Sequence, residues 1–109
     1  MADICVQIQP GRLASFDESC VEALCSAPAI AGLVQAVSKS EGTDQGRYIN
    51  VSFTAADPKA FWEALREHLV RLGLQGACIV TCTGQDGWND YLLLHHFEPE
   101  YRTGEHRAL

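Results

Sequence analysis

Aromatic and acidic residues gather in one short stretch near the C-terminal end of the chain. Residues 84–100 hold Asp86, Asp90, Glu98 and Glu100 with no Lys or Arg, together with Trp88, Tyr91 and Phe97. An aromatic ring can anchor in a pocket of a partner, while carboxylates steer and pair with its Lys and Arg side chains. The stretch therefore predicts a site for a basic protein partner, formed by Asp86, Trp88, Asp90, Tyr91, His95 and Glu98. The alternative left open is that Trp88 folds back over its own hairpin and the acids only solubilise it.

Thiols and imidazoles are the other groups that could do chemistry. The cysteines are Cys5, Cys20, Cys25, Cys78 and Cys82, and two of the histidines are adjacent, His95-His96. An alternative function is therefore a small enzyme or small-molecule binder, with a pocket between the first helix and the sheet. Its candidate residues are Cys20 or Cys25, His95 or His96, Tyr48 and Tyr91.

Metal binding is not predicted from these residues. Adjacent histidines on a strand point to opposite faces, and Cys78 and Cys82 on one strand face would lie about 13 Å apart. The sequence has no Cys-x-x-Cys spacing. Free cysteines of this kind usually act as small buried apolar side chains.

Several classes of function lack their sequence signals. The chain has no phosphate-binding glycine loop, no nucleophile elbow and no His-Glu-x-x-His. We therefore assign no cofactor and no catalytic residue, and the expectation leans against an enzyme. The net charge of -6 disfavours nucleic acid, which is bound through basic surfaces. An odd number of cysteines, no apolar run of membrane-spanning length and no visible signal peptide predict a cytoplasmic protein without a membrane partner.

Alternating apolar residues predict four strands, at 4–9, 48–54, 77–83 and 91–97. On the last strand, Leu92 and Leu94 would face the core with His96, leaving His95 outward beside Tyr91; the opposite parity is almost as apolar. The turn between the last two strands is short enough for a hairpin.

Two helical regions separate the strands. The spacing Ser15-x-x-Glu18 is that of a capping box, and it predicts two short helices or one helix kinked at Pro28 over 16–38. A polar loop is expected at 38–46. Asp57-Pro58 predicts the start of the other helix, and Gly73 predicts its end.

These elements predict an α/β (α+β) two-layer sandwich of order β-α-β-α-β-β. The expected sheet has four strands, is mixed, carries the helices on one face and ends in a hairpin. The 109 residues form one domain, 1–109, whose tail at 100–109 is expected to fray. The sheet's second face is mostly polar, and it either faces water or docks another protein or a second copy. Its predicted members are Cys5, Gln7, Gln9, Tyr48, Asn50, Ser52, Thr54, Thr81 and Thr83.

Overall fold

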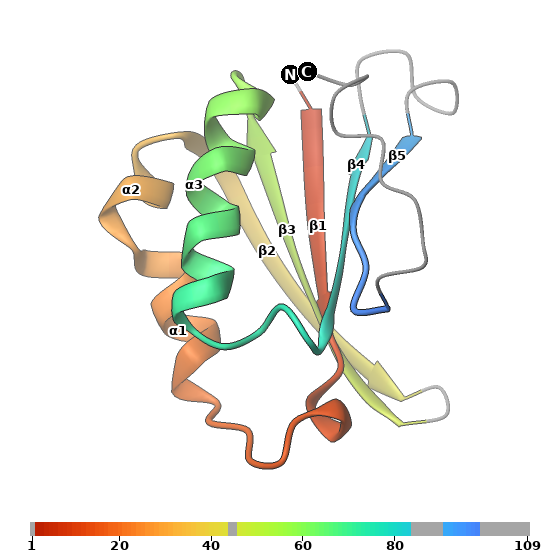
Figure 1. The fold of residues 1–109 in the computed structure, drawn as a ribbon. Helices are drawn as coiled ribbons and strands as arrows, with labels where there is room; N and C mark the ends of the chain where they lie inside the picture. Colours follow the sequence, from red (N-terminus) through yellow and green to blue (C-terminus); the bar gives the residue numbers. More distant parts are fainter. Residues whose placement is uncertain (1, 44–45, 84–90, 99–109) are drawn as a thin grey trace.

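The computed structural model describes residues 2–43, 46–83 and 91–98 (Figure 1). Its strands are β1 (Ala2–Ile8), β2 (Val34–Thr43), β3 (Arg47–Ala55), β4 (Cys78–Thr83) and β5 (Tyr91–His95). Its helices are the 3-10 turn η1 (Pro10–Arg12), α1 (Ser19–Ser26), α2 (Pro28–Ala31) and α3 (Pro58–Arg71). The hairpin loop at 84–90 and the tail from 99 onward lie outside the described residues, so the expectation of fraying is not tested.

The strands form one five-stranded sheet in the order β2-β3-β1-β4-β5. Every neighbouring pair in it is antiparallel. The helices α1, α2 and α3 lie together on one side of this sheet (Figure 1). From β1 to β4 the succession of strands and helices is the split βαβ, or ferredoxin-like, arrangement, with β5 added beside β4.

The α+β class and the final hairpin are as predicted, but the four-stranded mixed sheet and the β-α-β-α-β-β order are wrong. The missing strand is β2, which occupies the region expected to be helix and polar loop. Ile30, Leu33, Val34 and Val37 share helical spacing, yet α2 ends at Ala31. The next residues pair along β3 from Val34↔Ala55 to Thr43↔Arg47. Gly46, directly before β3, has a φ of 132°, a backbone conformation that glycine adopts more readily than other residues.

The start of α1 also differs from the prediction. The helix begins at Ser19, and the side chain of Asp17 accepts the Ser19 N–H at 2.9 Å. Ser15 lies outside the helix, so the expected capping box does not form. The carboxylate of Asp17 instead accepts one of the amides that the first turn of the helix leaves unpaired. The Ser19 amide also lowers the pKa of Asp17.

Helix α3 matches the prediction at both ends. The Asp57 side chain accepts the Ala60 N–H at 3.1 Å, and Pro58 occupies the first turn. At the other end Gly73 has a φ of 70°, and the Leu74 N–H donates to the Leu69 carbonyl. This bond closes a Schellman motif, which satisfies carbonyls that the helix end leaves unpaired.

The core lies between the helices and the central strands. Ile4, Val6 and Ile8 of β1 are fully buried, and Val6 pairs with Val51 on one side and Val80 on the other. The rings of Phe53 and Phe61 pack with their centroids 5.0 Å apart, joining β3 to α3. Burial of each such side chain contributes about 1.5–3 kcal/mol, so this layer holds the fold together.

Replacement of Asp57 by Ala tests the cap of α3. We expect Asp57→Ala to lower the free energy of unfolding by about 1 kcal/mol, because it leaves the Ala60 N–H without its acceptor. Asp57→Asn keeps an acceptor and should lose little. Urea denaturation of the three proteins measures the difference, and equal stability of the Ala and Asn variants would contradict the assignment.

Candidate functional site

The predicted aromatic-acidic site falls mostly outside the described residues. Asp86, Trp88 and Asp90 lie in the 84–90 loop, and only the backbone of Tyr91 is described. The other two members, His95 and Glu98, are placed at the end of β5 and just beyond it. This site therefore stays a prediction.

His95 has a structural partner. A bulge in the β4–β5 ladder sets it opposite the buried Val80, so it does not continue the row beside Tyr91. Its Nε2 lies 2.7 Å from the Gln75 carbonyl, and because a carbonyl only accepts, Nε2 carries the proton and donates. His95 thereby joins β5 to the loop that follows α3.

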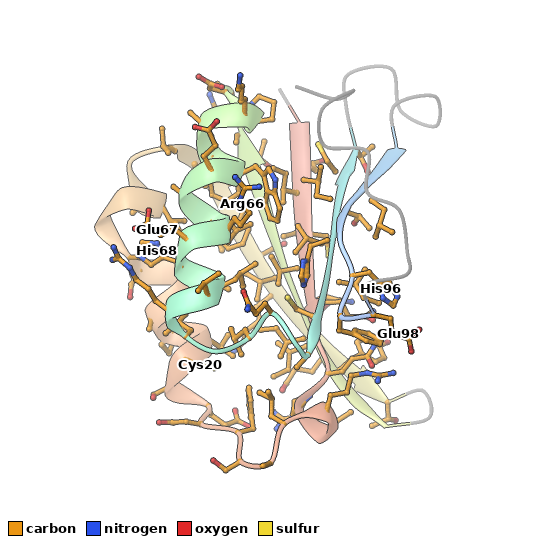
Figure 2. The ribbon with its side chains drawn as sticks, in the orientation of Figure 1. Cys20, Arg66, Glu67, His68, His96 and Glu98 are labelled. Atoms are coloured by element: carbon orange, nitrogen blue, oxygen red, sulfur yellow. The ribbon has the colours of Figure 1, made fainter. Side chains whose placement is uncertain are left out.

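His96 lies beyond the last residue of β5. The centroid of its ring lies 4.3 Å from the centroid of the Phe97 ring. Its Nδ1 accepts the backbone N–H of Glu98, and both residues are labelled in Figure 2. Leu94 faces the core as expected, but His96 is half-buried and stands outside the core cluster. The predicted alternation thus ends with the strand.

The side of the sheet away from the helices is the broadest candidate surface, and we call it the open face. The nine polar and cysteine positions predicted for this face are all half-buried. Register confirms that they share one side, since Cys5 lies opposite both Ser52 and Thr81. Ile79 and Leu93 join them, and β2 adds Ala36, Ser38, Ser40 and Gly42.

Charge is scarce on the open face. Among the described strand positions that point to this side, only Asp3 carries a formal charge. Its Oδ1 accepts a hydrogen bond from the Thr54 hydroxyl at 2.8 Å. The remaining described side chains on this side carry no formal charge. The chain's formal charge of -6 is thus carried largely by other surfaces.

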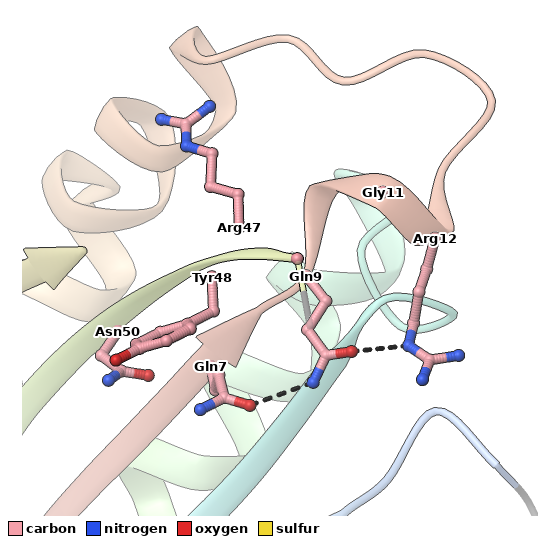
Figure 3. Close-up of a pocket in the computed structure, with 8 residues that line it drawn as sticks. Gln7, Gln9, Gly11, Arg12, Arg47, Tyr48 and Asn50 are labelled. Atoms are coloured by element: carbon pink, nitrogen blue, oxygen red, sulfur yellow. Dashed lines mark hydrogen bonds between the residues drawn. The ribbon is translucent and has the colours of Figure 1, made fainter. Parts of the chain in front are cut away.

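At one end of the open face the structure has a pocket of about 520 Å³ (Figure 3). It lies where β1 ends, η1 turns and β3 begins. Its lining comprises Gln7, Gln9, Gly11, Arg12, Gly46, Arg47, Tyr48 and Asn50. The prediction named the face but not this pocket. Two sequence segments mark the pocket: Pro10-Gly11-Arg12 after the end of β1 and Gly46-Arg47 at the start of β3.

Hydrogen bonds order the polar side chains of the pocket. Arg12 Nε donates to Gln9 Oε1 at 2.6 Å, and Gln9 Nε2 donates to Gln7 Oε1 at 3.0 Å (Figure 3). The Arg12 guanidinium carbon also lies 3.5 Å from the centre of the Phe97 ring, a cation–π contact. These contacts fix Arg12 and leave its terminal N–H groups and Gln7 Nε2 as donors.

Arg47 lines the pocket, but its guanidinium forms salt bridges with other residues. Its guanidinium pairs with Glu18 and Glu41, and in Figure 3 its side chain extends toward the helices. Its donation lowers the pKa of the Glu18 carboxyl. Arg12 is therefore the cation available to a ligand in this pocket.

The ring of Tyr48 lies over Gly42 on the neighbouring strand. A Cβ built at Gly42 would collide with the hydroxyl end of that ring. Beside it, Asn50 Oδ1 is buried without a hydrogen-bond partner among the described residues. An unpaired buried oxygen costs about 1–3 kcal/mol, so this wall gains stability when a donor reaches it.

The arrangement suits binding more than catalysis. Its lining, as far as the structure describes it, contains no thiol, imidazole or carboxylate that could act as nucleophile or general base. What it offers is N–H donors, one guanidinium and a phenol. Such a lining binds carbonyl or carboxylate oxygens of a partner or small ligand.

Burial makes three of the five cysteines, Cys20, Cys25 and Cys78, poor nucleophiles. Burial raises the pKa of Cys20 and Cys25, each reinforced by a nearby acid, and raises the pKa of Cys78 to about 12. A higher pKa leaves less of the nucleophilic thiolate. Cys20 lies on α1 (Figure 2), and Cys78 belongs to the core cluster. The described part of the chain also holds no cluster of three metal-binding side chains.

The chain has no match among family models, curated proteins or solved structures. In the described ranges, no helix is both long and apolar enough to cross a membrane.

Alkylation with iodoacetamide near pH 8, where an ordinary thiol is partly ionised, tests the thiol assignment. We expect Cys20 and Cys25 to react no faster than a free cysteine peptide, and Cys78 to react only after unfolding, because burial disfavours their thiolates. Peptide mass spectrometry reads each site. A cysteine in the folded protein that reacts faster than the peptide would revive the thiol-enzyme alternative.

Proposed function

We propose that the chain is a non-catalytic protein-binding module that docks a partner on its open face. We expect the chain to act in the cytoplasm as a small acidic inhibitor or an immunity-type protein. The observation that carries the proposal is a broad sheet face whose side chains are mostly uncharged and, on the central strands, mostly half-buried, and which no described helix covers.

The chemistry of the open face supports docking. Charged residues are depleted at the centres of protein interfaces, because desolvating an unpaired charge costs free energy. At the middle of the face, Ser52 and Thr81 offer hydroxyl groups for hydrogen bonds, and Cys5 between them offers a weakly polar thiol. A flat surface without a nucleophile or base in its pocket fits recognition better than turnover.

The pocket would give such a partner its anchor. A carboxylate or carbonyl from the partner can accept from Arg12, whose orientation Gln9 and Phe97 already fix. Prior ordering lowers the entropy lost on binding.

We further propose that the partner is basic overall. The chain carries -6, and the predicted site of Asp86, Trp88, Asp90, Tyr91, His95 and Glu98 adds an aromatic anchor among acids beyond β4. Opposite charges on the two proteins would raise the rate of encounter, and this effect falls as salt is added.

Co-purification from the source cells with the tagged full chain tests the open face. We expect Ser52→Arg to lose a basic protein that the wild type retains, by at least tenfold in mass-spectrometric yield, because it places a bulky charge at the centre of the face. The matched control is Ala23→Arg, which adds the same side chain at an exposed position of α1.

Two results would count against the proposal. Retention of the partner by Ser52→Arg as well as by Ala23→Arg would remove the open face from the interface. A wild-type preparation with no such protein would remove the binding function itself.

The hairpin contribution is tested separately on the purified pair. We expect Trp88→Ala, and the double change Asp86→Asn with Asp90→Asn, each to weaken binding about tenfold, because one removes the ring and the other removes two charges. Calorimetry at two salt concentrations distinguishes them: the Asn variant should lose most of the salt dependence and the Ala variant should keep it. Unchanged affinity in both would exclude the hairpin.

A further inference from the structure

The strand β2 forms an open edge of the sheet. Nine of its ten residues pair with β3 on one side, and no described strand pairs with the other. Positions 35–41 are all exposed. Proteins usually protect such edges with proline, bulges or unopposed lysine, because free backbone groups attract another strand. Here the bulge lies at Val34/Ala36, and the residues from 37 to 43 are regular and contain no proline.

Two charges on this edge are arranged symmetrically about one residue. Lys39 and Glu41 flank Ser40, and both point to the helix side, since they lie opposite the buried Val51 and Ile49. Lys39 makes no salt bridge to any described residue. Glu41 binds Arg47, which also holds Glu18.

A second copy of the chain would meet this pattern with its own. In an antiparallel pair related by a two-fold axis normal to the sheet, centring on Ser40 places Lys39 opposite Glu41 of the second copy, twice. If the axis passes through Lys39 or Glu41 instead, that residue lies opposite the same residue of the second copy, so two like charges face each other. Opposite charges across a strand pair stabilise it and like charges destabilise it, so charge selects the Ser40 register.

The other side chains fit the same register. On the open face, Ser40 meets Ser40 and Ser38 meets Gly42, which are small and uncharged. On the helix side Val37 meets Thr43, two β-branched residues that favour strands. Val37 is 41% exposed although it lies opposite the fully buried Phe53, so the helices leave room at this edge.

We propose that the chain forms a two-fold homodimer by antiparallel pairing of β2 with β2 of a second copy, centred on Ser40. The two five-stranded sheets then join edge to edge, with both open faces on one side. A single strand pair buries less than a standard interface, so the dissociation constant lies in the micromolar range or weaker. The dimer goes beyond the proposed function, since it uses the edge of β2 and leaves the open face accessible.

Charge reversal gives a paired test by analytical ultracentrifugation from about 10 μM to about 1 mM. We expect the wild type to dimerise over this range and Lys39→Glu and Glu41→Lys each to weaken it at least tenfold, because every pair across the axis becomes repulsive. An equimolar mixture of the two variants should dimerise within about threefold of wild type, since both pairs across the axis of a mixed dimer again join a carboxylate to an ammonium group.

Matched controls lie on α3, where Lys59→Glu and Glu63→Lys make the same charge changes at exposed positions and should leave dimerisation unchanged. Circular dichroism confirms folding, and Glu41→Lys still leaves Arg47 its bond to Glu18. A wild-type mass of one chain throughout overturns the dimer. Undiminished dimerisation of both variants, or a mixture that stays as weak as its components, overturns the edge and register.

Discussion

The fold depends on the two-sided pairing of β1. Its three apolar side chains are completely buried, and its backbone is bonded to β3 on one side and β4 on the other. The helical connections from β1 to β2 and from β3 to β4 pass over the same side of the sheet, and they carry α1, α2 and α3 there. Among the described residues, no helix or second sheet lies on the opposite side of the central strands. The polar, weakly charged open face is a direct consequence of this one-sided cover.

Much of the fold could be predicted from the sequence, because the buried strands and α3 carry strong periodicity and caps. The strand β2 could not, because an edge strand with one exposed side needs no apolar alternation and is held mainly by hydrogen bonds to β3. Its polar composition therefore looks like a loop, and Ile30, Leu33, Val34 and Val37 share helical spacing by coincidence. Gly46 was the remaining signal of a hairpin.

Nine residues of the open face were predicted, since alternation fixes which side chains share a side once the opposite side is apolar, while the positions on β2 were missed with that strand. The pocket was not, because it joins η1 to the start of β3, and proximity across a sheet depends on strand order. Asn50 is far from Gln7 and Arg12 in the chain and meets them only because β1 and β3 are neighbours. The orientation predicted for His95 differs from the observed one because a bulge in the β4–β5 ladder interrupts the alternation of side chains.

The contact between Tyr48 and Gly42 has a consequence for how this sequence can vary. The ring occupies the volume that any side chain at position 42 would need. Because the obstructing atoms are the far end of a side chain that can swing away, a larger residue at position 42 would reshape the pocket wall more than it would destabilise the sheet. Residues 42 and 48 should therefore covary in size among related sequences, with a bulkier residue at 42 accompanied by a smaller one at 48.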